Sequence, residues 1–338
     1  MPRSLVTGAT GFVGSNLVSY LLERGWEVRC LVRDVSRAAT LERLGAELAP
    51  GQLADAESIL RAAQGVDVVF HVAGRVYALH DRQFFADNVE GTRNVAAACA
   101  AQSRRPVMLY VSSLAAGGPS TLDAPRREND QDRPISAYGR SKLGAERAAA
   151  ALASEVPLSI LRPPIIFGPA DRASLKLFQG VRFLRLHPLP GWRRFEVSLV
   201  HVADLCEAMV RIAERGARVT PSSNGRPDIS AATYHVAAER TIAYGELGKL
   251  AAGALGCSVL SLPLPKPLFW LVGALAEAVG QIRRQPMLLN LDKTREALAT
   301  GWVCSDEKIR RELDYRPAAP LEQRFAETVA WYREQGWL

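Results

Sequence analysis

The first 165 residues alternate short β-branched runs with stretches of helical apolar spacing, and this alternation constrains the fold more than any other feature. Strands are predicted at Ser4–Thr7, Glu27–Val32, Ala46–Ala49, Val66–His71, Val107–Ser112 and Leu158–Leu161. Helices are predicted at Gly11–Arg24, Ala54–Ala63, Phe84–Gln102 and Ala137–Ser154. Strands joined by helical crossovers form right-handed βαβ units, so the predicted fold class is α/β with a doubly wound parallel sheet. Such sheets bind ligands outside the carboxyl ends of their strands.

Composition narrows the class of protein further. The 338 residues are 48% hydrophobic and 23% charged, which is typical of a globular chain with a large core. The net charge of +7 is scattered, with no run of five like charges, and this argues against a nucleic-acid partner. The five cysteines are far apart and form no C-x-x-C pair, which predicts free thiols and no metal site. No export signal is visible at the N-terminus, so a cytoplasmic protein is expected.

Three glycines follow the first predicted strand. Gly8, Gly11 and Gly14 stand at spacing G-x-x-G-x-x-G, between that strand and an apolar-periodic helix. The first permits a tight turn, the second lets backbone amides approach a pyrophosphate, and the third allows close packing of helix on strand. The helix N-terminus favours the negative charge of the phosphates. In this context the motif predicts a dinucleotide cofactor.

The end of the second predicted strand bears on which dinucleotide is bound. A ribose 2′-hydroxyl favours an acid at this place, whereas a 2′-phosphate favours a cation. Arg33 supplies the cation, which favours NADP(H) over NAD(H). Asp34 is the counter-evidence, since it could bind ribose itself or pair with Arg33 or Arg37.

Tyr138 and Lys142 are four residues apart on a predicted helix and therefore share one face. An ammonium fixed beside a phenol favours the phenolate form. Ser113 follows the fifth predicted strand, whose carboxyl end should face the same crevice as the glycine loop. A serine hydroxyl there can hydrogen-bond a substrate oxygen while the tyrosine exchanges its proton, as hydride chemistry on an alcohol or ketone requires. Alternatively, Ser113 only satisfies backbone groups at a strand end.

These residues resemble the extended short-chain dehydrogenases/reductases, the NAD(P)-dependent epimerase/dehydratase superfamily, over nearly the whole chain. The resemblance rests on Thr7–Gly14, His71–Gly74, Asn88–Asn94, Ser112-Ser113, Tyr138-x-x-x-Lys142, Leu161–Pro169, Val200–Leu205 and Leu313–Pro317. The stretch 28–34 is similar to the dihydroflavonol reductase and 3β-hydroxysteroid dehydrogenase-like branch, in which the arginine recognises NADP. The chain departs from the family at Gln52, where an acid is usual near the adenine. It also lacks the Asp-Glu pair of sugar dehydratases after Ser113, which argues against dehydration.

The resemblance implies a catalytic triad of Ser113, Tyr138 and Lys142. It further implies that Lys142 holds the nicotinamide ribose and that backbone near Pro163–Ile165 meets the carboxamide. The cofactor-binding residues expected from motifs and resemblance together are Gly8, Thr10, Gly11, Phe12, Val13, Gly14, Arg33, Asp34, Gln52, Leu53, Ala73, Gly74, Tyr138, Lys142, Pro163 and Ile165. A homodimer through the helices Phe84–Gln102 and Ala137–Ser154 is expected by the same analogy.

Beyond residue 165 the pattern is less regular and mostly helical. The expected division is a dinucleotide-binding Rossmann domain over 1–165, to which 196–240 returns, and a smaller, mostly helical substrate-binding lobe formed by 166–195 and 241–338. Asp204 and Glu207 predict a capping box that opens a helix over Leu205–Arg215. The polar stretch Pro221–Ser230 is predicted to be a surface loop.

The longest apolar stretch, Pro267–Gly280, is too short for the ~20 residues of a spanning helix. We expect a helix packed on its own domain. The alternatives are a segment that lies on a membrane surface, since Lys266 and Arg283-Arg284 flank it, or one that roofs a lipophilic pocket.

Three functions remain open at this point. The first is an NADP(H)-dependent oxidoreductase that interconverts a secondary alcohol and a ketone, with a sizeable, largely apolar substrate that is steroid-, flavonol- or β-ketoacyl-like. The second is a nucleotide-sugar epimerase with tightly bound NAD, in which Arg182, Arg185, Arg193 and Arg194 clamp a diphosphate; a solvated basic loop is the preferred reading of these arginines. The third is a non-catalytic dinucleotide-binding sensor.

Overall fold

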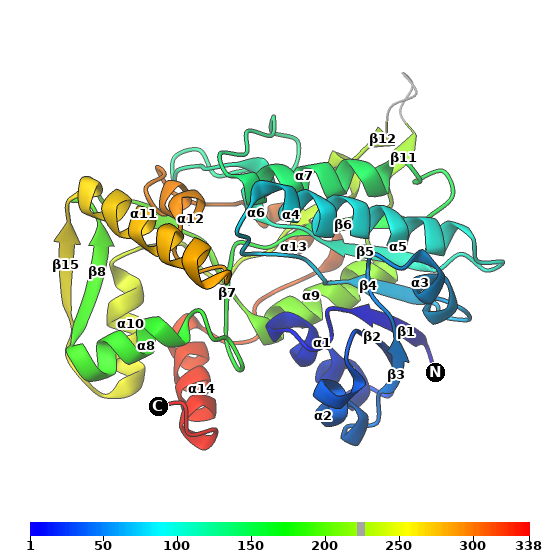
Figure 1. The fold of residues 1–338 in the computed structure, drawn as a ribbon, viewed down its shortest axis with the longest axis horizontal. Coiled ribbons are helices and arrows are strands. Elements are labelled where there is room, and N and C mark those ends of the chain that lie inside the picture. The colour runs from blue at the N-terminus through cyan, green and yellow to red at the C-terminus, as the bar shows by residue number, and fades with distance from the viewer. Residues whose placement is uncertain (222–226) are drawn as a thin grey trace.

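The computed structural model describes residues 1–221 and 227–338, and a seven-stranded parallel sheet forms its centre (Figure 1). The strand order is β3-β2-β1-β4-β5-β6-β13. The bounds are β1 Arg3–Thr7, β2 Glu27–Val32, β3 Glu47–Pro50, β4 Val68–His71, β5 Val107–Val111, β6 Leu158–Arg162 and β13 Thr233–His235. The predicted doubly wound parallel sheet is therefore confirmed, and β13, which is only three residues long, is the strand that the sequence pattern did not reveal.

Helices cover both faces of this sheet. On one face α1 (Phe12–Glu23) packs with α9 (Val202–Arg215) over a large apolar cluster. On the other face α3 (Ala56–Ala62), α5 (Gly91–Ala100) and α7 (Ala137–Ala150) pack over a second cluster. Burial on both faces explains why strands such as β4 are continuous apolar runs.

The predicted helix Phe84–Gln102 is in fact three consecutive segments. They are α4 (Asp81–Phe84), the π-helical η2 (Phe85–Glu90) and α5. A π-turn has a wider hydrogen-bond ring than an α-turn and leaves no signal in apolar spacing, so the sequence could not predict it. Shorter helices follow β2 and β5: η1 (Val35–Ala38), α2 (Ala39–Arg43) and α6 (Leu114–Gly117).

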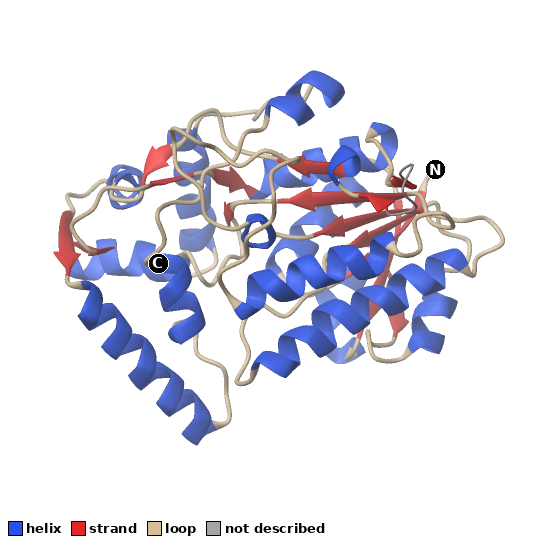
Figure 2. Ribbon diagram, turned by 90° about the horizontal axis from the view of Figure 1, so that it is seen from above, coloured by secondary structure: helices blue, strands red, loops and turns tan. Residues whose placement is uncertain are grey.

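Most of the remaining elements gather at the end of the molecule away from the sheet, whereas α13 (Glu307–Leu313) packs on α9 and β13 (Figures 1 and 2). A parallel pair, β8 with β15, and an aromatic cluster of Phe167, Phe178, Phe325 and Tyr332 hold this part together. The elements are β7 Ile165–Phe167, α8 Leu175–Gln179, η3 Gly180–Leu184, β8 Leu186–Pro190, β9 Glu196–Val197, β10 Leu199–His201, β14 Ile242–Ala243, α10 Glu246–Leu255, β15 Leu260–Leu264, α11 Lys266–Arg283, α12 Leu291–Ala297, α13 Glu307–Leu313 and α14 Leu321–Glu334.

The predicted capping box at Asp204 is wrong. Helix α9 begins at Val202, and His201 caps it by accepting a hydrogen bond from the amide of Ala203. Asp204 lies in the first turn of the helix, where it is buried and accepts hydrogen bonds from Arg324 and from the amide of Ala318. The acid thus ties the C-terminal segment to α9, a contact 120 residues apart in sequence that no local pattern can indicate.

Helix α11 packs on its own domain, as expected for Pro267–Gly280, but its apolar side faces outward. The segment is helical, but Gly273 and Gly280 are its only buried residues, and most of its large apolar side chains are exposed. Among the described residues no helix is long and apolar enough to cross a membrane.

The structure also shows the state of the cysteines and part of the predicted loop Pro221–Ser230. All five cysteines are free thiols, and four of them are buried. The described residues contain no cluster of three or more metal-ligating side chains. Residues 222–226 of the predicted loop Pro221–Ser230 lie outside the described residues, whereas its edges form the short pair β11 (Thr220–Pro221) and β12 (Pro227–Asp228).

Candidate active site

The glycine loop after β1 is built around two positions that cannot carry a side chain. Gly8 has φ +74°, and a Cβ there would lie 2.7 Å from the backbone nitrogen of Ala73. A Cβ on Gly14 would lie 2.1 Å from the carbonyl oxygen of Gly8. Helix α1 therefore begins directly against the end of β1, with Gly11 as its N-cap. Its first turn contains no acid and no side-chain cap, so its amide groups can receive an anion such as a pyrophosphate.

The predicted residues Thr10, Phe12 and Val13 lie in this same loop and first turn, where Thr10 is exposed and the other two are half-buried. Leu53 also has a fixed place, since its carbonyl oxygen accepts a hydrogen bond from Asn94. The side chain of Gln52 is exposed, and the backbone amide of Gln52 donates a hydrogen bond to the hydroxyl of Ser58.

At the end of β2, Arg33 and Asp34 have different surroundings. The carboxylate of Asp34 accepts hydrogen bonds from the amide and hydroxyl of Ser36 and lies 3.3 Å from Arg37. These contacts lower the pKa of Asp34, the hydrogen bond from the Ser36 side chain most of all. Arg33 is exposed, and within residues 1–221 and 227–338 no carboxylate pairs with it. Asp34 thus caps the following turn and leaves the Arg33 cation available.

The segment after β4 contributes the next wall of the site. The amide of Ala73 donates to the hydroxyl of Thr7, which places it against the glycine loop. Gly74 is exposed, and a Cβ on it would lie 3.5 Å from Nζ of Lys142 and 3.3 Å from Oδ1 of Asn88. A side chain at 74 would therefore narrow the space between the glycine loop and Lys142.

Asn88 is a residue whose position sequence reasoning did not foresee, although it begins the Asn88–Asn94 motif. It lies in the π-helical turn η2, buried, where it accepts from the amide of Arg75 and donates to the hydroxyl of Ser141. These bonds join the segment after β4 to α7, the helix that carries Tyr138 and Lys142. The extra residue of the π-turn allows Asn88 to reach both partners.

Ser113 and Tyr138 come together at the carboxyl end of β5. Ser113 caps α6 by accepting from the amide of Ala115, and its side chain is close enough to Tyr138 to lower the pKa of that phenol. Burial raises the pKa of Tyr138 well above its ordinary value, and Ser113 only partly opposes this. The phenol is therefore protonated at neutral pH. Pro163, at the end of β6, lies beside this pair, because its carbonyl oxygen accepts from the amide of Leu114; Ile165 is exposed at the start of β7.

Lys142 is buried on α7 but does not contact the phenol through any hydrogen bond in the described part of the chain. Its ammonium donates to the carbonyl oxygen of Val111 at 2.7 Å and lies 4.5 Å above the ring of Tyr110. Burial lowers the pKa of Lys142 to about 7, partly opposed by Glu146 one turn further along the helix. The three residues of the predicted triad thus surround the end of β5, with Lys142 bonded to the strand itself.

A buried ion network supports this end of the sheet, and sequence reasoning missed it. Arg162 at the end of β6 donates to Glu146 at 2.6 and 2.8 Å and to Asp132 at 2.6 Å. Glu146 also accepts a hydrogen bond from Ser112, the neighbour of Ser113. Because each charge has a partner, the network is tolerated inside the protein. It fixes α7 against β5 and β6, and hence the backbone that carries the triad.

Helix α12 reaches the site from the C-terminal region. The carboxylate of Asp292 accepts from the amides of Ala137 and Tyr138, at 2.8 and 3.2 Å, in the first turn of α7. The ammonium of Lys293 lies 4.3 Å above the ring of Tyr138 and pairs with Glu296. The sequence offers no local sign of these contacts, since about 155 residues separate the partners.

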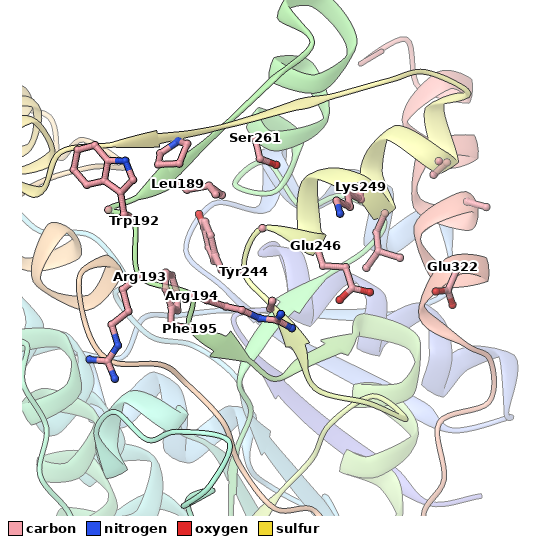
Figure 3. A pocket seen from close by; sticks show the side chains of 18 residues that line it. Leu189, Trp192, Arg193, Arg194, Phe195, Tyr244, Glu246, Lys249, Ser261 and Glu322 are labelled. Carbon is pink, nitrogen blue, oxygen red and sulfur yellow. The ribbon is translucent and has the colours of Figure 1, made fainter.

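A cavity of about 760 Å³ lies between β8, β15, α10 and α14 (Figure 3). Its lining combines apolar side chains, among them Leu189, Trp192 and Tyr244, with Arg193, Arg194 and Lys249. Of the four arginines considered for a diphosphate clamp, Arg193 and Arg194 line the cavity, whereas Arg182 and Arg185 do not. None of Ser113, Tyr138 and Lys142 borders it.

Comparison with known proteins agrees with this geometry. The model of the NAD dependent epimerase/dehydratase family matches residues 4–224. A ceramide reductase of Caulobacter vibrioides is 30% identical over 98% of this chain and 95% of its own length. A putative dihydroflavonol 4-reductase of Synechocystis is 29% identical over 98% of this chain and 95% of its own length.

Among solved structures, the crystal structure of gox2253 superposes with a TM-score of 0.76 at 26% identity and covers 100% of both chains. The family's members use NAD(P), and the loop of Gly8, Gly11 and Gly14 with the open N-terminus of α1 fits the pyrophosphate of such a cofactor. Sequence match, sheet order and glycine loop lead to one conclusion: the chain belongs to the NAD-dependent epimerase/dehydratase family, within the extended short-chain dehydrogenases/reductases, and is an NAD(P)-dependent oxidoreductase.

Proposed function

We propose that this protein is an NADP(H)-dependent reductase that interconverts a ketone and a secondary alcohol on a sizeable, largely apolar substrate. The observation that carries the proposal is that Ser113 lies close enough to Tyr138 to lower its pKa, at the carboxyl end of β5, where buried Lys142 is bonded to Val111. In the parallel sheet this edge also carries the glycine loop after β1. A cofactor pyrophosphate at that loop and a carbonyl at Ser113 and Tyr138 would therefore share one crevice.

The residues of this crevice divide the work of carbonyl reduction. A bound nicotinamide supplies the hydride, and the protein must neutralise the charge that develops on the carbonyl oxygen. Ser113 can donate a hydrogen bond to that oxygen. Tyr138, whose raised pKa keeps it protonated, donates the proton. Lys142, anchored to Val111, holds positive charge behind the pair and is placed to bind a ribose hydroxyl beside Gly74.

The substrate class rests on what surrounds Tyr138. Ala78, Phe84 and Ala137 form a buried apolar cluster with its ring, and the rings of Phe84 and Tyr138 are 6.1 Å apart. Such a wall favours an apolar group beside the reacting carbon. The similar proteins named above, a ceramide reductase and a putative dihydroflavonol 4-reductase, support the same class of substrate. We expect NADPH oxidation with β-ketoacyl compounds, sterol ketones or flavonoids, and none with nucleotide sugars.

Tyr138→Phe tests the role of the phenol. The substitution removes the proton donor but keeps the ring and its packing, so turnover should fall by about 100-fold or more. NADPH binding, measured by fluorescence titration, should be unchanged. Tyr77→Phe is the matched control, since its phenol also lies near Lys293, yet it is not placed as the donor. Turnover of Tyr138→Phe close to that of the unaltered enzyme would refute the assignment.

Arg33→Ala tests the cofactor preference. Because Asp34 is occupied by Ser36 and Arg37, the free guanidinium of Arg33 is proposed to pair with the 2′-phosphate of NADP(H). The ratio of kcat/KM for NADPH over NADH should exceed one and should fall about 10-fold or more in the variant. Arg43→Ala on α2, an exposed arginine that bonds only within its own helix, should leave the ratio unchanged.

Two alternatives remain as outcomes of these measurements. Stoichiometric NAD released from denatured protein would favour the nucleotide-sugar epimerase, with Arg193 and Arg194 at the cavity as the anion-binding pair. Cofactor binding without turnover of any carbonyl compound would favour the sensor. Neither is preferred, because Arg33 favours an exchangeable NADP(H) and because all three residues of the triad are present.

A further inference from the structure

Helix α11 turns its apolar face away from the protein. Leucine, valine and isoleucine side chains at positions 268, 271, 272, 275, 279 and 282 are all exposed, and Leu275 and Ile282 retain 57% and 82% of their surface. Their spacing of three and four residues puts them on one side of the helix. A surface helix of a globular protein ordinarily directs such a stripe into the core, so this orientation requires an explanation.

The opposite side of α11 fixes this orientation. A Cβ on Gly273 would lie 2.2 Å from the hydroxyl of Thr294, and Gly280 packs against residues 285–287. Glu277 accepts a hydrogen bond from the amide of Leu291, and Gln281 donates to the carbonyl oxygen of Leu79. Two glycines and two hydrogen bonds thus hold one side of the helix against the protein, which leaves the apolar stripe outside.

Charge at the two ends of the helix indicates what covers the stripe. Lys266 precedes it and Arg283 and Arg284 follow it, and all three are exposed. Glu277, whose carboxylate is bonded to α12, is the single acid between residues 258 and 291. An apolar stripe between exposed cations complements the anionic headgroups and acyl chains of a bilayer surface.

Neighbouring apolar side chains extend this surface. Trp192 is 71% exposed and follows Gly191, whose amide bonds the carbonyl oxygen of Leu264 just before α11. Leu260, at the start of β15, and the pair Phe183-Leu184 before β8 are also exposed. Trp192 therefore adds apolar area at the strand ends that lead into α11.

A second copy of the chain fits this face less well. Two-fold contacts between copies place the same patch against itself. If the two α11 helices ran antiparallel, Lys266 would face Arg283 and Arg284 of the other copy; if they ran parallel, each cation would face its equivalent. In both arrangements like charges meet around an apolar centre, which costs free energy.

We infer that α11 docks this enzyme, as a peripheral protein, on the surface of anionic lipid bilayers, with the stripe at the boundary of headgroups and acyl chains. The inference does not depend on the proposed reaction. It has a consequence for the site, since α11 packs on α12, which contacts the first turn of α7 through Asp292. A docked molecule would hold its catalytic helix one layer from the membrane.

Vesicle flotation of the full chain tests the inference, with phosphatidylcholine vesicles that contain or lack phosphatidylglycerol. The protein should float with the anionic vesicles. The triple variant Leu271→Asn, Leu275→Asn, Ile282→Asn should lower the partition coefficient by about 10-fold or more, because three side chains no longer enter the apolar layer. Lys266→Ser, Arg283→Ser, Arg284→Ser should lose the preference for phosphatidylglycerol.

Matched controls make the result specific. Leu44→Asn, Leu60→Asn, Leu122→Asn replaces three leucines that are also exposed, at 50%, 40% and 54%, but remote from α11 in the chain, and it should float as the unaltered protein does. Circular dichroism and melting should show all variants folded, and Ile282→Asn alone serves if the triple variant is not. Flotation that is absent in the unaltered protein, or unchanged in the stripe variant, overturns the inference. So does sedimentation velocity in which the stripe variant alone loses a dimer.

Discussion

At the scale of single residues, the burial of Lys142 lowers the stability of the folded chain. Burial lowers its pKa from 10.5 to about 7, so the protonated side chain is less favourable in the folded than in the unfolded chain. Between pH 7 and 10.5 the unfolded state binds the additional proton, and the free energy of unfolding therefore rises with pH through that window. Below pH 7 the full destabilisation by this group is present.

Lys142→Met should remove this effect together with activity. We expect the variant to melt at a higher temperature than the unaltered protein at pH 6.5, and the difference to shrink as the pH is raised toward 10. Thermal unfolding without cofactor across that range measures it. Lys249→Met, which replaces a lysine that lines the cavity, is the control and should give no such trend. A difference in melting temperature that stays constant at all pH values would mean that packing, and not charge, determines the destabilisation by Lys142.

Serine and tyrosine show a different relation between residue and environment. Ser113 caps α6 and lies close enough to Tyr138 to lower its pKa. The cap confirms the alternative expectation of a structural serine, whereas the catalytic role of Ser113 stays a prediction. The sequence could identify the residue but could not separate the two roles.

At the scale of elements, two connections between distant helices determine the geometry of the triad. The π-turn η2 brings Asn88 to Ser141, and α12 brings Asp292 to the first turn of α7. The second contact acts as a cap that is supplied from another helix. A carboxylate at a helix N-terminus bonds free amides and also opposes the positive end of the helix dipole.

Asp292→Ala should therefore lower both stability and turnover. The loss of the cap should cost about 1 kcal/mol of unfolding free energy. Because the amide of Tyr138 loses its partner, kcat should fall several-fold while the Kd for NADPH stays the same. Asp292→Asn, which keeps one acceptor oxygen, should recover part of kcat. Asp55→Ala removes the side-chain cap of α3 far from Tyr138 and should lower stability alone. Equal kcat in the two alanine variants would show that Asp292 only stabilises the fold.

At the scale of the whole molecule, burial of neutral histidines links folding to acid. Burial lowers the pKa of His71 and His235 to about 3 and that of His187 and His201 to about 4. The unfolded chain protonates these rings near pH 6.5, whereas the folded chain does not. Unfolding should therefore take up protons between pH 6.5 and 4, and the free energy of unfolding should fall as the pH falls through that window.

Urea unfolding at pH 7.5, 6 and 5 measures this dependence. Each of these histidines should contribute up to about 1.4 kcal/mol per pH unit within the window. His235→Gln should reduce the slope by the share of one group, since both ring nitrogens of His235 are buried. His80→Gln, at an exposed histidine, should leave the slope unchanged. A slope that does not respond to His235→Gln would assign the acid sensitivity to other groups.

The sequence alone determined six strands of the parallel sheet, the glycine loop, and the places of Ser113 after β5 and of Tyr138 and Lys142 on one helix. These features depend on periodicity and on residues near one another in the chain, where local physical chemistry decides. Only the tertiary structure decided that Asp204 pairs with Arg324, that Asp292 caps α7, and that the apolar side of α11 faces outward. Each of these depends on which surface another segment covers. Apolar spacing shows which side of a helix is hydrophobic but not what covers that side. In α11 the hydrophobic side faces outward, whereas a surface helix ordinarily directs it into the core.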